Sequence, residues 1–234
     1  MRVLALAFAL SSFTFCFMAD ASTVADFSGN KGSGTPNITI GYQFHGFKDS
    51  EFQGESEVLR WLKELETKAR GCLWTELGLR LKLQRAYIAK PIDQLKEEIE
   101  NWTKGGGTVD PFKALYYLKK FFDRRYNTDI VCLITKKPLY DTKTANYFGF
   151  AIHQTLCETE VPMLLTYDKE KVNETGHEFC LFIRDSIKNF KFFDWWKKTR
   201  VEKKKYFDEC NRYILDSTRG LTLPILVDSP LAEV

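Results

Sequence analysis

Hydrophobic and polar residues alternate along the chain with two different periods, and the period changes several times. In 38–44 and again in 77–88 every second residue is apolar, which is the pattern of a half-buried strand. Between these segments, 55–72 carries apolar residues at the spacing of an amphipathic helix, and Gly71 is expected to mark its end. The first part of the chain therefore predicts a strand, a helix and a second strand.

Two helices, three strands and a further helix are predicted next. Pro91 and the pair Asp110-Pro111 are typical of first helical turns, and 130–134 is continuously apolar, as in a central strand. The expected elements are helices in 91–102 and 110–125, strands in 129–134, 145–152 and 161–167, and a helix from about residue 175. An aromatic stripe in the second of these helices is interpreted as core. Its residues are Phe112, Tyr116, Phe121 and Phe122.

This order of elements favours an α/β (α+β) fold, in which helices pack a mixed, largely parallel twisted sheet. No internal repeat and no clear linker divide the chain, so 37–234 is interpreted as a single globular domain. The Gly-, Ser- and Asn-rich segment 22–36 before it is predicted to be a flexible leader. With 44% hydrophobic residues, the chain can bury a sizeable core.

Residues 1–21 have the pattern of a secretory signal peptide. Arg2 precedes an apolar run from Val3 to Phe17, and Ala19-Asp20-Ala21 supplies the small residues that signal peptidase recognises. A membrane anchor is the alternative, but the run is short for a span, and no later stretch is apolar for long enough to cross a bilayer. We therefore expect a secreted, extracellular protein. Its net charge of +3 is too small to favour a nucleic-acid partner.

Five cysteines remain once Cys16 is removed with the signal peptide. In an oxidising compartment, an odd number of this size favours two disulfide bonds and one remaining thiol. That thiol is either buried and inert or a link between two chains, and the sequence leaves the pairing open. The candidates are Cys72, Cys132, Cys157, Cys180 and Cys210.

Three acceptor sequences for N-linked glycans support the same compartment. They begin at Asn37, Asn101 and Asn173, and none has Pro in the middle position. Behind a signal peptide they predict a glycoprotein, with these asparagines facing solvent.

Several segments resemble the reprolysin-like branch of the metzincin metalloproteases. These segments are 129–135, 147–151 with Cys157 after it, 161–168, Gly176-His177-Glu178 and Tyr213-Ile214-Leu215. The first is similar to a strand of that family, the second to its glycine-containing edge segment and the third to the strand that follows. Gly176-His177-Glu178 falls where the zinc helix begins, and the last segment falls at the methionine turn, with Leu215 in place of Met. The resemblance implies a metzincin-like fold stapled by disulfides.

The residues that would complete a zinc site are missing from this motif. A zincin helix needs two histidines four residues apart, with a glutamate between them as general base. Here His177 and Glu178 are followed by Leu181 at that position, and the third histidine of the family would fall at Ile187. Because Leu and Ile do not ligate metal ions, we predict a pseudoenzyme with no catalytic residue, no metal and no other cofactor.

Two enzymatic interpretations remain as alternatives. A secreted zinc hydrolase with an atypical site would need the other histidines, His45 and His153, to lie beside His177. Cys180 follows His177 by three residues, a spacing that would allow a cysteine–histidine nucleophile pair on one helix. In an oxidising compartment, a disulfide or a buried thiol is the favoured interpretation of Cys180.

The chain as a whole, with its signal peptide, cysteines and glycosylation sequences, also resembles the tick salivary immunosuppressant family of nominal thirty-six-kilodalton size. This resemblance implies a non-catalytic binding protein of saliva that suppresses T-lymphocyte proliferation and cytokine output in the host. The partner it implies is a host immune protein or a cell-surface component. No catalytic residue is carried over from that family.

A basic segment near the C-terminus is the strongest charge signal. Its cationic residues are Lys197, Lys198, Arg200, Lys203, Lys204 and Lys205. Flanked by aromatic residues, they fit binding to a heparin-like polyanion or to an acidic protein surface. The favoured interpretation is a helix whose lysines form a solvated face, with Phe193, Trp195 and Trp196 in the core.

Overall fold

A five-stranded sheet forms the centre of the structure, a computed structural model that describes residues 34–91, 93–103, 107–122, 128–139 and 148–210. Its strands are β1 (Asn37–His45), β2 (Lys82–Ala89), β3 (Ile130–Thr135), β4 (Gly149–Phe150) and β5 (Val161–Thr166). They lie in the order β2-β1-β3-β5-β4, and only β4 runs antiparallel to its neighbour. The predicted mixed, largely parallel sheet is confirmed.

Several of the sequence-based predictions lie wholly or partly outside the described residues. Among them are the signal peptide 1–21, all but the last residues of the leader 22–36, the end of the helix expected in 110–125, the first part of the strand expected in 145–152, the segment Tyr213-Ile214-Leu215 and the end of the domain 37–234. In the part of the chain that is described, no helix is both long enough and apolar enough to span a bilayer.

β3 lies in the middle of the sheet, and all six of its residues are buried. Its continuous apolar sequence follows from this place, because both faces of a central parallel strand are covered. Asp129, just before β3, accepts hydrogen bonds from the backbone N–H and the hydroxyl of Thr39 at 2.7 and 2.8 Å. This buried carboxylate fastens the start of β3 to β1.

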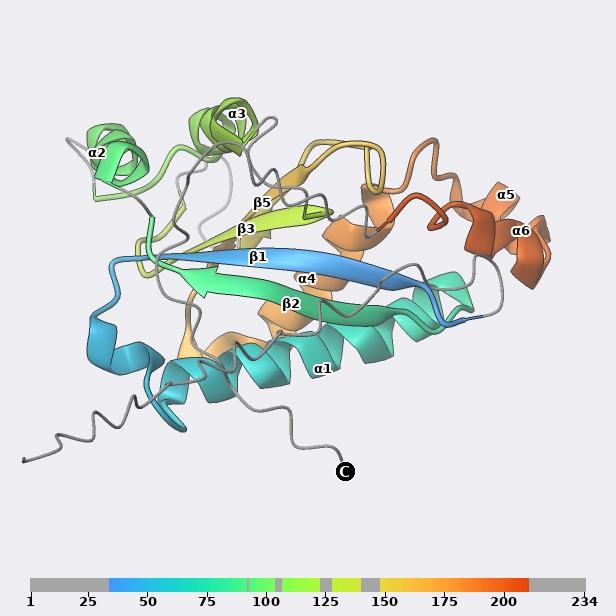
Figure 1. Ribbon diagram of the computed structural model, residues 1–234, viewed down its shortest axis with the longest axis horizontal. Coiled ribbons are helices and arrows are strands. Elements are labelled where there is room, and N and C mark those ends of the chain that lie inside the picture. Colours follow the sequence, from blue (N-terminus) through green and yellow to red (C-terminus); the bar gives the residue numbers. More distant parts are fainter. Residues whose placement is uncertain (1–33, 92, 104–106, 123–127, 140–147, 211–234) are drawn as a thin grey trace, which may run out of the picture. The chain divides into compact units, whose positions relative to one another are not determined.

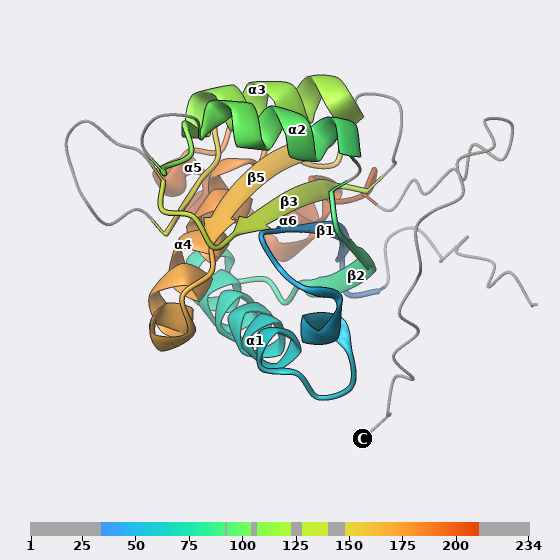
Figure 2. The ribbon, with the colours of Figure 1, turned by 90° about the vertical axis from the view of Figure 1, so that its left-hand side faces the viewer.

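Two pairs of helices cover the two faces of the sheet (Figure 1, Figure 2). The first pair is α1 (Glu57–Leu77) and α4 (Val172–Asp185), and the second is α2 (Asp93–Trp102) and α3 (Pro111–Phe122). Alternate residues of β3 point to the two layers. Ile130, Cys132 and Ile134 belong to the core beside α1 and α4, whereas Val131 and Leu133 belong to the core beside α2 and α3. The predicted order of elements is confirmed through α4.

The first helix ends later than the sequence pattern predicts. Gly71 lies inside α1, and the helix continues to Leu77, so β2 begins at Lys82 rather than at residue 77. Gly78 ends the helix with a left-handed φ of 61°, and its N–H donates to the carbonyl of Trp74. Leu73 and Leu77 are fully buried in this extra length of helix. Burial of that apolar face outweighs the weak helix preference of Gly71.

The aromatic stripe of α3 is only half in the core. Phe121 and Phe122 are buried, as predicted, but Phe112 is 60% exposed and Tyr116 is 70% exposed. The face of α3 that meets the sheet is made instead by smaller apolar residues, among them Leu115 and Leu118. The expectation of a buried Phe112 and Tyr116 was therefore wrong.

The C-terminal basic segment forms two short helices where a single helix was expected. These are α5 (Phe192–Lys197) and α6 (Arg200–Lys205), and two 3-10 turns, η1 (Asp49–Phe52) and η2 (Lys169–Lys171), complete the described elements. Thr199 breaks the segment because it caps α6. Its N–H donates to the carboxylate of Glu202 at 2.7 Å, and its hydroxyl accepts from the N–H of Glu202.

The expectation of two disulfide bonds and one thiol is confirmed. The bonds join Cys72 to Cys180 and Cys157 to Cys210. Cys132 is the free cysteine among the described residues, and it is fully buried in β3. Burial raises the pKa of its thiol well above the usual range, which keeps the sulfur protonated and unreactive.

Candidate functional site

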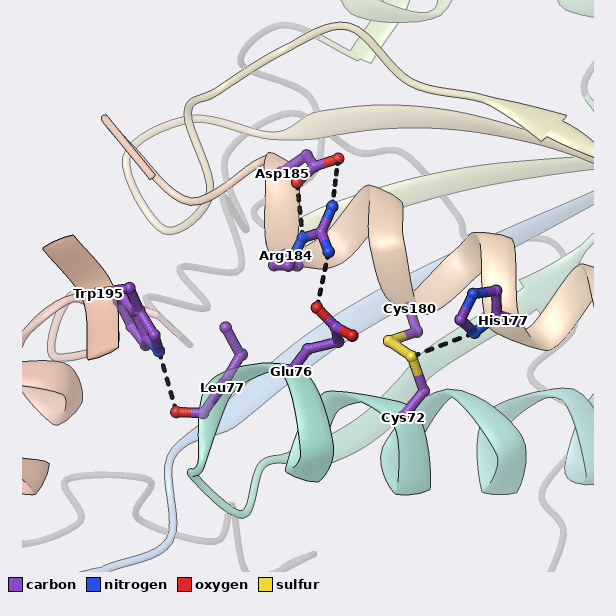
Figure 3. Close-up of polar contacts among 8 residues, drawn as sticks. All are labelled: Cys72, Glu76, Leu77, His177, Cys180, Arg184, Asp185 and Trp195. Atoms are coloured by element: carbon purple, nitrogen blue, oxygen red, sulfur yellow. Dashed lines mark hydrogen bonds and ion pairs between the residues drawn. A yellow bond between two sulfur atoms is a disulfide. The ribbon is translucent and has the colours of Figure 1, made fainter. Parts of the chain in front are cut away.

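The helix that contains the degenerate zincin motif is α4, and it lies alongside α1 on one face of the sheet (Figure 1, Figure 2). His177 is exposed, and its Nδ1 lies 3.6 Å from Sγ of Cys72 in α1 (Figure 3). Gly176 brings the two helices together, because a Cβ there would lie only 2.8 Å from Cβ of Lys68 and 3.1 Å from the carbonyl of Leu65. His177 is thus held against a disulfide at a close helix–helix contact.

We call this contact the α1–α4 seam and define it by Cys72, Glu76, His177, Cys180 and Arg184. Cys180 is one turn beyond His177 and bonds to Cys72, so it is no nucleophile while the disulfide is intact. Arg184, one turn further, donates to Glu76 of α1 at 2.7 Å and to Asp185 (Figure 3). The hydrogen bonds to Asp185 and Glu76 raise the pKa of Arg184, which keeps this cation charged. The polar groups of the seam are therefore already bonded to one another, through the disulfide and through the hydrogen bond of Arg184 to Glu76.

The positions that would complete a zinc site carry apolar side chains. Leu181 is half-buried one turn after His177, and Ile187 is buried just beyond the end of α4. His45 lies elsewhere, at the end of β1, with Nδ1 at 3.3 Å from the hydroxyl of Thr135. Burial lowers the pKa of His45 to about 4. His153 follows β4, and burial lowers its pKa as well.

The ranges that the structure describes contain one group of three side chains whose ligand atoms lie within 4.8 Å of one another. It consists of Asp129, Cys157 and Cys210. The two cysteines form a disulfide, and the carboxylate of Asp129 already accepts hydrogen bonds from Thr39. Neither sulfur is available as a thiolate in this state, so the group does not bring together a ligand set for a divalent metal.

The C-terminal helices are anchored on the last carbonyl of α1. Trp195 is buried, and its indole N–H donates to the carbonyl of Leu77 at 2.9 Å (Figure 3). Lys203 is buried beside it, donates to the same carbonyl at 3.0 Å, and places its ammonium 4.2 Å from the ring centroid of Trp196. A cation and an N–H donor at this point satisfy a helix-end carbonyl that has no partner within the helix. Burial lowers the pKa of Lys203.

Three aromatic side chains next to this anchor lie largely in water. Phe193 is 80% exposed, and Phe192 and Trp196 are 48% and 45% exposed. The ring of Phe192 lies 5.9 Å from that of Phe193 and 6.2 Å from that of Trp196, so the three form one cluster. The expectation that Phe193 and Trp196 belong to the core was therefore wrong. Neighbouring helix residues point about 100° apart, so the adjacent pair in 195–196 already signals that one Trp is outside.

The six basic residues of the predicted polyanion site have different surroundings. Lys203 is buried, Lys204 donates to the carbonyl of Gly34, Lys197 pairs with Asp194 at 3.2 Å, and Lys198 lies over the ring of Tyr206. Arg200 and Lys205 are exposed. The cluster is thus more dispersed, and more involved in internal contacts, than its sequence indicates.

The exposed residues of this region define what we call the aromatic–basic face. It comprises Phe192, Phe193, Trp196 and Val201, together with Lys191, Lys197 and Arg200. The lysines are evident in the sequence, but the exposure of the aromatic residues is not, because composition alone does not distinguish a core aromatic residue from a surface one.

The three glycan acceptors differ in exposure. Asn101 on α2 and Asn173 on α4 are exposed. Asn37 is half-buried at the start of β1, where its side-chain amide donates to the side-chain carbonyl of Gln84. A glycan at Asn101 or Asn173 would extend into solvent without displacing a strand contact.

Comparison with known proteins finds no sequence relative. No protein-family model matches the chain, and no curated protein matches it. Solved structures do match. A chain of a chaperone–substrate complex is similar over 60% of this chain at 13% identity and a TM-score of 0.34, and this chain spans only 25% of its length.

Three of the matching structures are peptidases by description. The match to archaemetzincin from Methanopyrus kandleri covers 74% of this chain and 95% of that chain, at 13% identity and a TM-score of 0.37. The match to a zinc-dependent peptidase from Methanocorpusculum labreanum covers 73% of this chain and 99% of that chain, at 12% identity and a TM-score of 0.33. The match to metalloproteinase-II from Bacteroides fragilis covers 75% of this chain and 58% of that chain, at 12% identity and a TM-score of 0.38. All these scores are below 0.5, so we transfer neither activity nor ligands from them.

Proposed function

We propose that this protein is a secreted, non-catalytic binding protein that suppresses host immune responses through protein–protein contacts. In this proposal it lowers T-lymphocyte proliferation and cytokine output, as implied by the tick salivary immunosuppressant family that its sequence resembles. The observation that carries the non-catalytic part is the chemistry of α4. Its single imidazole, His177, lies against a disulfide, and Leu181 occupies the position of the second ligand. A hydrolytic zinc site needs three protein ligands and a water.

Secretion has separate support. Residues 1–21 have the charge, apolar core and small residues of a signal peptide. Two disulfide bonds fit an oxidising compartment, where they persist. The protein should therefore be tested in its oxidised, glycosylated form, purified from the medium of a secreting host cell.

The test has a chemical and a cellular part. Metal analysis of the purified protein is expected to show far less than one zinc ion per chain, and zinc at one ion per chain would revive the atypical hydrolase. In cultures of stimulated T lymphocytes, the protein is expected to lower proliferation and cytokine release with increasing dose. Protein whose disulfides have been reduced and alkylated serves as the control. Equal proliferation with and without the native protein would contradict the immunosuppressive role.

A second candidate function is binding to a heparin-like polysaccharide. Exposed Arg200 and Lys205, with Lys197 nearby, favour it. Reversing these three charges to Glu is expected to abolish retention on a heparin column, and wild-type retention is expected to fall steeply with salt. Unchanged retention of the triple variant would remove this candidate.

A further inference from the structure

The aromatic–basic face exposes more apolar surface than an isolated surface residue does. The ring of Phe192 lies beside those of Phe193 and Trp196, and Val201 on the next helix is 67% exposed. Single exposed apolar side chains are normal on soluble proteins, but contiguous aromatic clusters mark sites of interaction. At the same end of α1, exposed Trp74 carries the guanidinium of Arg80 over its ring at 5.4 Å. Aromatic rings and cations thus recur together in this region.

The charge around this cluster is strongly positive. Between Lys191 and Lys205 the sequence holds seven basic residues and two acidic ones. Lys191 and Lys197 directly flank α5's aromatic residues, and Arg200 begins α6 next to Val201. Long basic side chains can keep their charge at a headgroup layer while the adjacent rings enter it.

The two short helices that carry the cluster are anchored to the end of α1. Trp195 and Lys203 both donate to the carbonyl of Leu77, and the cap formed by Thr199 fixes the break between α5 and α6. Trp196 lies against Gly78, where a Cβ would be 3.0 Å from the ring. A face whose side chains are already positioned loses less conformational entropy when it binds.

We propose that the aromatic–basic face binds the surface of an anionic phospholipid membrane. Phe192, Phe193 and Trp196 enter the headgroup region, and Lys191, Lys197 and Arg200 contact the lipid phosphates. The protein lies on the bilayer and does not span it. This binding goes beyond the proposed contact with an immune partner and would bring the protein to cell surfaces that expose anionic lipid.

A lipid surface fits this face better than a polysaccharide does. Of the six basic residues of the predicted polyanion site, Lys203 is buried and Lys204 donates to a backbone carbonyl. A polysaccharide, which binds through cations, would find fewer of them available than the sequence indicates. The aromatic rings, by contrast, leave apolar area in contact with water, with Phe193 80% exposed, and interfacial binding grows with the apolar area that leaves water.

The experiment measures binding of the full chain to vesicles of phosphatidylcholine alone and of phosphatidylcholine mixed with phosphatidylserine. Co-sedimentation gives the affinity, and quenching of Trp fluorescence by brominated acyl chains reports the insertion of Trp196. We expect binding only to the mixed vesicles, and weaker binding as salt is raised. Binding to neither type of vesicle overturns the proposal.

Paired variants separate the apolar and the charged contributions. Phe192→Ser with Phe193→Ser is expected to weaken vesicle binding by roughly tenfold or more, since it removes the inserted area. Its control is Phe112→Ser, an aromatic residue of α3 that is 60% exposed, and this variant should bind like the wild type. Lys191→Glu with Arg200→Glu should also weaken binding, whereas Lys63→Glu, exposed on α1, should not.

Heparin retention distinguishes the two ligands. The double Phe variant should keep its heparin retention while it loses vesicle binding, and circular dichroism verifies that it is folded. If the double Phe variant binds vesicles like the wild type, or if the chain binds heparin but no vesicle, the face is not a lipid site and the proposal is overturned. A soluble protein partner that binds this face in the absence of any vesicle binding would overturn it equally.

Discussion

The α1–α4 seam and the aromatic–basic face are both built on α1, yet they use their chemically active side chains in opposite ways. In the seam, Cys72 forms a disulfide with Cys180 and Arg184 forms a salt bridge with Glu76, so these side chains hold two helices together. Next to the face, buried Trp195 attaches α5 to α1 through its hydrogen bond to Leu77, whereas Phe193 and Trp196 are exposed. The motif most suggestive of chemistry thus forms a structural contact, while two aromatic residues expected in the core, Phe193 and Trp196, are exposed.

The physical basis of this contrast is the number of partners that each group already has. A buried or half-buried polar group is stable only when it is hydrogen-bonded, and once bonded it has little left to offer a ligand. An exposed aromatic ring still gains free energy when it leaves water, about 25 cal/mol per Å² of apolar area. Binding is therefore expected at the face and not at the seam.

The largest effect is expected from breaking the seam. Cys72→Ser together with Cys180→Ser removes a cross-link between residues 108 positions apart, and this should lower the free energy of unfolding by about 4 to 5 kcal/mol. Urea unfolding followed by circular dichroism measures the change. His177→Gln, which keeps the disulfide, is the control and should lose much less. A loss of under about 1 kcal/mol in the double Ser variant would show that packing alone joins the helices.

The next effect tests the anchor of the face. Trp195→Ala should lower the free energy of unfolding by about 3 to 4 kcal/mol, because it empties a buried site and leaves the Leu77 carbonyl with one donor fewer. Phe193→Ala, two residues away but 80% exposed, should change it by no more than about 0.5 kcal/mol. Thermal and urea unfolding of both variants check the difference. Equal losses would mean that Phe193 is part of the core.

A smaller effect depends on pH and concerns the buried imidazole of His45. Because burial lowers the pKa of His45 from 6.5 to about 4, the unfolded chain binds more protons than the folded chain between these values. His45 should therefore destabilise the fold progressively as pH falls through this window, by about 3 kcal/mol in total. His45→Gln should flatten this part of the stability curve.

Unfolding free energies of the wild type and of His45→Gln at a series of pH values give the two slopes. The assignment of the slope to the buried imidazole fails if His45→Gln keeps the slope of the wild type.

The smallest expected effect concerns metal. Leu181→His restores the two-histidine spacing of a zincin helix, yet zinc content should stay well below one ion per chain. His177 lies against Cys72, and Ile187 lies beyond the end of α4, so two imidazoles at most would face one ion. Calorimetric titration with zinc measures the affinity. Tight binding of one zinc ion would contradict this expectation and would show that one substitution is enough to turn the seam into a metal site.

Much of the fold was predictable because periodicity reports how each element meets the core. The continuous apolar run of β3 indicated a central strand, and the alternation in 38–44 indicated β1. The end of α1 was not predictable from local preference, because Gly71 and Gly78 are equally good stop signals in the sequence. Only burial of Leu73 and Leu77 against the rest of the core distinguishes them.

Residue spacing along the chain was enough to indicate the order of strands and helices through α4, the number of disulfides that five cysteines allow, and the absence of a second imidazole one turn from His177. These features depend on composition and on spacing within one element. Tertiary structure alone decided which cysteines pair, that Lys203 is buried while Phe193 is exposed, and that His177 meets a sulfur atom. Each of these outcomes depends on which distant segments pack together, and pairing between distant segments leaves no trace in local periodicity.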